Sequence, residues 1–225
     1  MEFKNHSSLK GTHAPFSASQ SSWLRYDPEK FEDKLFNVYR SALGTEIHDF
    51  ASSQIILGHR YRSPKILREA IETYIYRKFY NEDYEMLDQQ GTKLLKNLPK
   101  LNPQVFDTVI QFVNDSIGYK MHSEQTLFYS QYFYGTADAI SFDEKNKALM
   151  IFDLKTGVNP AHMDQLEVYA ALFCLEYGYR PSEISIELRL YQNGEIVSGT
   201  PDVDNILNIM NIMIEQTKCL TELDI

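Results

Sequence analysis

The chain has 225 residues, of which 43% are hydrophobic, so it is long enough to bury the core of one sizeable domain. Its formal net charge of −9 at pH 7 argues against a protein that coats nucleic acid non-specifically. No apolar run reaches the ~18 residues of a membrane span, and two cysteines give no disulfide framework.

The first residues, 1–14, lack an apolar segment typical of a secretory signal, so we expect them to form a flexible leader. The two cysteines, Cys174 and Cys219, fit a reducing compartment, and we therefore expect a cytoplasmic protein.

Hydrophobic periodicity predicts a helical N-terminal part followed by alternating strands and helices. The helices are expected at 17–26, 41–57, 66–87, 103–119, 161–177 and 202–223. The strands are expected at 123–134, 137–142, 148–154, 183–191 and 195–198. Residues 29–40 are expected to be partly helical, and 89–101 to form a polar connector. This order predicts an α/β domain with a mixed sheet and helices on its faces.

A glycine and a histidine, Gly44 and His48, are four residues apart in the predicted helix 41–57 and therefore share one face. The glycine would allow this helix to pack closely on the sheet. A lone histidine in a helix is more often a hydrogen-bonded structural residue than a metal ligand.

A basic segment precedes the predicted helix 66–87 and contains the densest positive charge of the chain. Its members are His59, Arg60, Arg62, Lys65 and Arg68. They either contact phosphates of a nucleic acid or form a solvated face paired with nearby acids, and the sequence favours neither reading.

The stretch 135–170 predicts two strands and a helix that bring acidic groups together. Asp153 and Lys155 point to one side of their strand and Leu154 to the other, because strand side chains alternate. Asp138 lies in the preceding strand of the same hairpin. Paired carboxylates suit a hard divalent cation such as Mg²⁺ or Mn²⁺, and a neighbouring lysine can orient water. A D-x-K triplet alone is a weak signal.

Several short motifs in a fixed order carry a resemblance to a known family. They are Gly44-x-x-x-His48, Gly135-x-x-Asp138, Asp153-x-Lys155 and Gln165-x-x-x-Tyr169, with an opening segment Phe16-Ser17-Ala18-Ser19-Gln20 and Trp23. Over residues 14–192 the chain resembles PD-(D/E)xK nucleases of the RecB-like exonuclease branch, in particular the phage and prophage members.

The resemblance implies a restriction-endonuclease-like fold, with a mixed central sheet flanked by helices after an N-terminal helical part. We expect a single nuclease domain over 15–225. Its expected parts are a helical part at 15–100 that carries the histidine, a sheet core at 101–200 and a C-terminal helix at 201–225.

The resemblance also implies roles for individual residues. Asp138 and Asp153 would bind Mg²⁺ or Mn²⁺, together with His48 and the backbone carbonyl of Leu154, and a nitrogen ligand would favour Mn²⁺. Lys155 would orient the attacking water. Gln165 would hold water or phosphate near the metal, and Tyr169 would support it. Arg60, Arg62, Lys65 and Arg68 would contact DNA. No iron–sulfur cluster is expected, because two cysteines cannot hold one.

The implied activity is a metal-dependent deoxyribonuclease, most simply an exonuclease in phage-type recombination or end resection, acting in the host cytoplasm if phage-encoded. A single-strand annealing or recombination protein would be its partner. An endonuclease of the same superfamily and a nuclease-like DNA- or protein-binding module without turnover are the alternatives. The negative charge predicts DNA binding that is weak and dependent on metal or partner.

Overall fold

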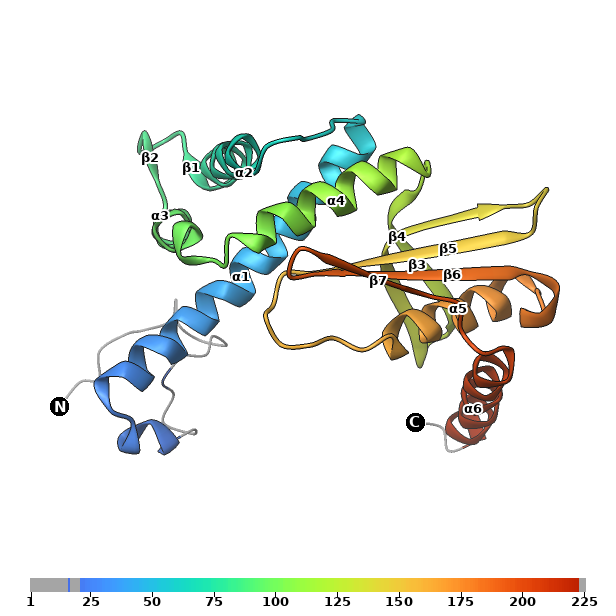
Figure 1. The fold of residues 1–225 in the computed structure, drawn as a ribbon. Helices are drawn as coiled ribbons and strands as arrows, with labels where there is room; N and C mark the ends of the chain where they lie inside the picture. Colours follow the sequence, from blue (N-terminus) through green and yellow to red (C-terminus); the bar gives the residue numbers. More distant parts are fainter. Residues whose placement is uncertain (1–15, 17–20, 223–225) are drawn as a thin grey trace.

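A computed structural model describes residues 16 and 21–222, and every structural statement below concerns these residues. The main sheet has five strands in the order β3-β4-β5-β6-β7 (Figure 1). The strands are β3 (His122–Ser130), β4 (Phe133–Asp143), β5 (Ala148–Lys155), β6 (Ser185–Gln192) and β7 (Glu195–Gly199). All neighbouring pairs are antiparallel except β5 and β6, so the sheet is mixed.

The parallel pair requires a crossover, which α5 (Asp164–Tyr177) provides. Strand β5 is buried over most of its length, as expected for a central strand covered on both faces. The 143–148 turn joins β4 to β5, and Asp143 accepts backbone hydrogen bonds from Lys145 and Asn146 there. The predicted hairpin and helix over 135–170 are therefore confirmed.

Two hydrophobic cores lie on opposite faces of the sheet. On one face, Phe152 and Leu154 of β5 pack beneath α1 (Pro28–Leu57) and α4 (Gln104–Gly118). On the other, Ile151 and the β6 residues Ile186, Leu188 and Leu190 pack against α5 and α6 (Val203–Glu222). Alternation along β5 thus divides its side chains between two layers of helices.

The helix that carries Gly44 and His48 is longer than predicted, because α1 is one helix of 30 residues that starts at Pro28. Asp27 caps it by accepting a hydrogen bond from Lys30 N at 2.8 Å, and Pro28 stands at the first helical position. Periodicity predicted this helix only from residue 41, although the pair Asp27-Pro28 is typical of a helix start. The first turns of α1 lead away from the sheet (Figure 1), and no residue of 28–42 is fully buried, which accounts for their weak periodicity.

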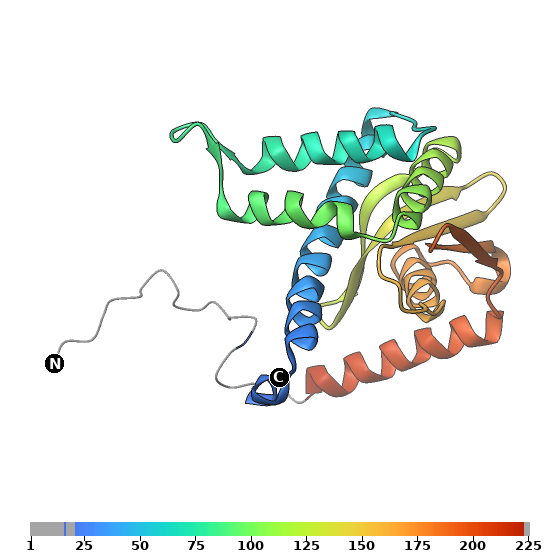
Figure 2. The same cartoon turned by 60° about the vertical axis from the view of Figure 1, so that its left-hand side comes forward.

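An arm of secondary structure projects from the domain beside α1 (Figure 2). It contains α2 (Pro64–Phe79), the hairpin of β1 (Tyr80–Asn81) and β2 (Met86–Leu87), α3 (Gln89–Asn97) and the short η3 (Leu98–Lys100). The predicted helix 66–87 is therefore wrong beyond Phe79, and the predicted connector 89–101 is wrong because it is largely helical.

Two side-chain caps explain both errors in the arm. Asn81 Oδ1 accepts hydrogen bonds from the N–H groups of Asp83 and Tyr84, which turns the chain out of the helix. Asp88 accepts a hydrogen bond from Gly91 N at 2.7 Å and so starts α3.

The N-terminal segment is described only in part. The expected helix 17–26 corresponds to a short 3-10 helix, η2 (Ser21–Arg25), whereas Ser17, Ser19 and the leader 1–14 lie outside the described residues. Trp23 is half-buried.

The architecture is mixed α/β, with helices on both faces of a five-stranded mixed sheet and a helical N-terminal part. This much of the predicted fold is confirmed. Among the described helices, none is both long and apolar enough to cross a membrane.

Candidate metal centre

The two predicted metal-binding acids lie where β4 and β5 separate. The antiparallel register of these strands ends with Ala139 opposite Phe152, so Asp138 and Asp153 are the next residues on either side. In place of a further strand pair, the Leu154 N–H donates a hydrogen bond of 2.8 Å to Asp138 Oδ2. The structure therefore brings both carboxylates to one point of the sheet, while the role predicted for the Leu154 carbonyl stays a prediction.

A chain of side-chain contacts runs from β5 to α5. Lys155 Nζ lies 3.1 and 2.9 Å from the two carboxylate oxygens of Asp153 and donates to Gln165 Oε1 at 2.7 Å. Gln165 Nε2 then donates to the Tyr169 hydroxyl at 3.0 Å. The four residues that the D-x-K and Q-x-x-x-Y motifs singled out therefore form one connected network.

The helix α1 brings His48 to the same place from the other face. His48 Nδ1 lies 3.4 Å from Asp138 Oδ1. Gly44, one turn earlier, faces the end of β5, and a Cβ there would lie 2.9 Å from Thr156 Oγ1. The absence of a side chain at Gly44 thus permits the close packing that brings His48 to Asp138.

Glu124 in β3 is an acidic residue of the site that no sequence motif had indicated. It lies between the pairs Ser123–Ala139 and Gln125–Ala137, and so directly opposite Asp138. One ligand atom each of His48, Glu124 and Asp138 lie within 4.8 Å of one another. Glu124 has a φ of 52°, an uncommon backbone state for this residue type. The sequence could have indicated Glu124 as a site residue, because it lies in the predicted strand 123–134, which precedes the strand of Asp138.

The site is crowded with negative charge, and its pKa values reflect this. Burial, together with the charge of Asp138, raises the pKa of Asp153 to about 6. Burial and the same charge raise the pKa of Glu124. Burial alone would lower the pKa of His48, but its hydrogen bond to Asp138 and the surrounding carboxylates outweigh that effect and raise it.

The donor set fits a divalent cation. Asp153 is almost completely buried, and its Oδ2 has no hydrogen-bond donor with suitable geometry in the described residues, although Lys155 Nζ is close. A cation beside Asp138 would offset the unfavourable charge of both carboxylates. Oxygen ligands suit Mg²⁺ or Mn²⁺, and a nitrogen ligand from His48 would favour Mn²⁺.

A cavity of about 560 Å³ opens onto this cluster between α1 and the β3–β4 pair. Arg40 of α1 lines it, and its guanidinium carbon lies 4.9 Å from the centre of the Phe36 ring. Arg40 was also missed from the sequence, because residues 29–40 gave no clear helix on which to place it. The cavity is lined by Asn37, Arg40, Ser41, Gly44, Thr45, His48, Asp49, Glu124, Asp138, Thr156 and Gly157.

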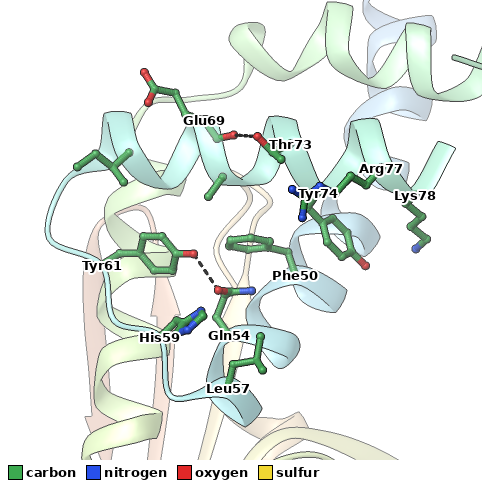
Figure 3. Close-up of a pocket in the computed structure, with 12 residues that line it drawn as sticks. Phe50, Gln54, Leu57, His59, Tyr61, Glu69, Thr73, Tyr74, Arg77 and Lys78 are labelled. Atoms are coloured by element: carbon green, nitrogen blue, oxygen red, sulfur yellow. Dashed lines mark hydrogen bonds between the residues drawn. The ribbon is translucent and has the colours of Figure 1, made fainter. Parts of the chain in front are cut away.

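The predicted DNA-binding residues lie elsewhere. A second cavity, of about 760 Å³, lies between the C-terminal half of α1 and α2, and His59 and Tyr61 contribute to its wall (Figure 3). Arg60 and Arg62 are exposed beside it. Lys65 and Arg68 line a third cavity, and Arg68 pairs with Glu72 at 3.4 Å. None of these basic residues lines the cavity that contains His48, and their contact with DNA stays a prediction.

Comparisons with known protein families and with curated protein sequences find no match to this chain.

Proposed function

We propose that the protein is a divalent-metal-dependent nuclease of the PD-(D/E)xK type, with a restriction-endonuclease-like core. One observation carries the proposal: carboxylates of β4 and β5, a histidine of α1 and a Lys-Gln-Tyr network meet at the point where two central strands separate. The joint arrangement supports the proposal more strongly than any single motif.

The metal would be held by Asp138, with His48 and Glu124 on one side and Asp153 on the other. When bound, Mg²⁺ or Mn²⁺ would polarise the scissile phosphate and lower the pKa of its bound water. The protein supplies the ligands and a polar cavity with room for a phosphodiester. Arg40, in the wall of this cavity, provides a positive charge suited to a phosphate oxygen.

Lys155 would hold and orient the attacking water. Its ammonium is fixed by Asp153 on one side and by Gln165 on the other, so its remaining proton can point at a water or a phosphate oxygen. Tyr169 fixes the amide of Gln165 in turn. In this arrangement Lys155 stabilises negative charge that develops on the phosphate, and Gln165 and Tyr169 set its position.

The substrate we propose is DNA, cut from an end in phage-type recombination or end resection, in the host cytoplasm if the protein is phage-encoded. A single-strand annealing or recombination protein is the proposed partner. Exonucleases and endonucleases share the motifs and the site. Cleavage of linear DNA compared with covalently closed circular DNA therefore has to distinguish them.

End-labelled linear DNA and covalently closed circular DNA, each incubated with Mn²⁺, with Mg²⁺ or with chelator, test the proposal. We expect metal-dependent loss of the linear DNA alone. The Asp153→Ala variant should be inactive and folded, with Glu144→Gln in the exposed β4–β5 turn as a matched control. Cutting of the circle would identify an endonuclease. No cleavage in any metal, with DNA binding retained, would identify a binding module without turnover.

A further inference from the structure

An exposed pair of aromatic rings extends from the proposed metal centre along the β3–β4 ladder. The rings of Phe128 and Tyr134 are stacked, with centroids 6.4 Å apart and planes inclined by 30°. Their side chains are 51% and 64% exposed, so neither ring belongs to a core. Aromatic side chains of this size are ordinarily buried or engaged, so an exposed stacked pair indicates a contact surface.

The rings lie on the same side of β4 as the metal ligands. A Cβ on Gly135 would meet the Tyr169 ring, and Ala137 packs in the core beneath α5, so these two residues face α5. Tyr134 and Asp138 therefore point the other way, toward α1 and His48. Asp138 follows Tyr134 by four residue steps, which is about 13 Å along the strand.

Two hydroxyl groups fill the interval between the rings and the carboxylates. Thr126 and Thr136 are paired across the strands, with their Oγ1 atoms 3.1 Å apart on the exposed surface. The outward face thus presents, in order, the Glu124–Asp138 acids, the two hydroxyls and the two rings. This order matches a nucleotide chain, whose phosphates accept hydrogen bonds from hydroxyls and whose bases stack on rings.

We propose that Phe128 and Tyr134 form a stacking platform for an unpaired base next to the phosphate held at the metal centre. This inference rests on the proposed nuclease function and specifies its substrate: a single strand, or a strand end separated from its complement. Inside a duplex both faces of a base are covered by its neighbours, so the platform can stack only on a base that is unpaired or terminal.

A binding experiment needs no cleavage and no altered protein at first. A single-stranded DNA oligonucleotide carrying 2-aminopurine at successive positions from one end is titrated with the wild-type protein in Ca²⁺, a hard cation that takes oxygen ligands in place of Mg²⁺, and both fluorescence and anisotropy are measured. Stacking should quench 2-aminopurine at one position near the end and not at the others. An oligonucleotide that is abasic at that position should bind about 5- to 150-fold more weakly.

Variants then assign the effect to the rings. Phe128→Leu and Tyr134→Leu keep an apolar side chain but remove the π face, so they should bind the intact strand as weakly as the wild type binds the abasic one. The conservative variants Phe128→Tyr and Tyr134→Phe should retain wild-type affinity. The salt dependence of binding should not change, because the rings carry no charge.

The two proposals fail in different ways. Equal affinity for intact and abasic strands, or no effect of both leucine variants, would overturn the platform even if the enzyme cleaves DNA. Base-dependent binding that requires the rings, without cleavage in any metal, would support the platform and contradict the nuclease. Full cleavage of duplex ends by the leucine variants would also overturn the platform.

Discussion

The site residues Asp153, Glu124 and His48 all have raised pKa values, so each holds its proton to a higher pH than the free side chain does. The cause is the same for the two carboxylates, because each is desolvated near Asp138. This arrangement is unfavourable for the fold by itself, and the proposed cation would offset the unfavourable charge.

The stability of the metal-free protein should therefore depend on Asp153. The pKa of this carboxyl is raised from an ordinary value of 3.8 to about 6 in the folded state, so the fold loses stability as the pH rises through that interval. The full effect, on the order of 3 kcal/mol at most, is present above about pH 7. Asp153→Asn should raise the Tm at pH 8 in chelator, with little change at pH 4. An unchanged pH dependence, relative to Glu144→Gln, would contradict this expectation.

The affinity for Mn²⁺ should rise with pH for the same reason. Because His48 and Asp153 must lose protons to bind a cation, the affinity should fall as the pH is lowered, by about tenfold per pH unit for each proton displaced. The fall due to Asp153 begins below about pH 6, and that due to His48 begins at a higher pH, because its pKa is raised above the ordinary value of 6.5. Titration calorimetry in buffers of different ionisation enthalpy measures the protons released. His59→Ala, at the far end of α1, is the control. An affinity that does not change between pH 5 and 8 would show that these residues are not the ligands.

At the scale of elements, two glycines set the distances around the site. Gly44 allows α1 to approach the end of β5, and Gly135 allows the Tyr169 ring of α5 to lie against β4. The first places His48 at Asp138, and the second places the Gln165–Tyr169 pair beside Lys155. The helices on the two faces thus reach one point of the sheet because each contact includes a glycine, Gly44 on α1 itself and Gly135 on β4 beneath α5.

A methyl group at Gly135 should disturb the site without unfolding the domain. Its Cβ would lie 2.9 Å from Tyr169 Cε1, so Gly135→Ala must displace the ring and its bond to Gln165. We expect cleavage to fall about 10- to 100-fold and the stability by about 1–3 kcal/mol. Gly199→Ala in β7 is the matched control, because its Cβ would meet nothing closer than 3.9 Å. Equal activity of the two variants would mean that the position of Tyr169 is unimportant.

For the molecule as a whole, a net charge of −9 opposes the approach of DNA, so local positive groups have to compensate. Two regions offer them. Arg40 lies in the wall of the cavity beside His48, Glu124 and Asp138. Arg60 and Arg62 lie at the junction of α1 and α2. A DNA strand bound at the proposed metal centre would meet Arg40 directly. It would reach Arg60 and Arg62 only if it continued along α1.

Salt dependence of binding separates these regions. If Arg60 and Arg62 each contact a phosphate, replacing both by alanine should make the negative slope of log affinity against log salt less steep, by about 1.5–2. Fluorescence anisotropy at several salt concentrations measures that slope. Lys145→Ala, in the exposed β4–β5 turn, controls for the loss of a surface charge. An unchanged slope in the double variant would assign Arg60 and Arg62 to a solvated face.

The sequence alone determined the elements whose patterns are local. Alternation predicted the strands, and the 3.6-residue period predicted the helices that pack on them. A spacing of two residues predicted that Asp153 and Lys155 share one side of their strand, and a spacing of four predicted that Gln165 and Tyr169 share one face of their helix. The tertiary structure decided what depends on residues far apart in the chain. It placed Glu124 opposite Asp138 through strand register, and it joined 28–57 into one helix that carries Arg40 to the cavity. It also placed the basic segment away from the cavity that His48 and Asp138 line. Spacing along one element is fixed by backbone geometry, whereas contacts between elements depend on how side chains pack, which no local pattern encodes.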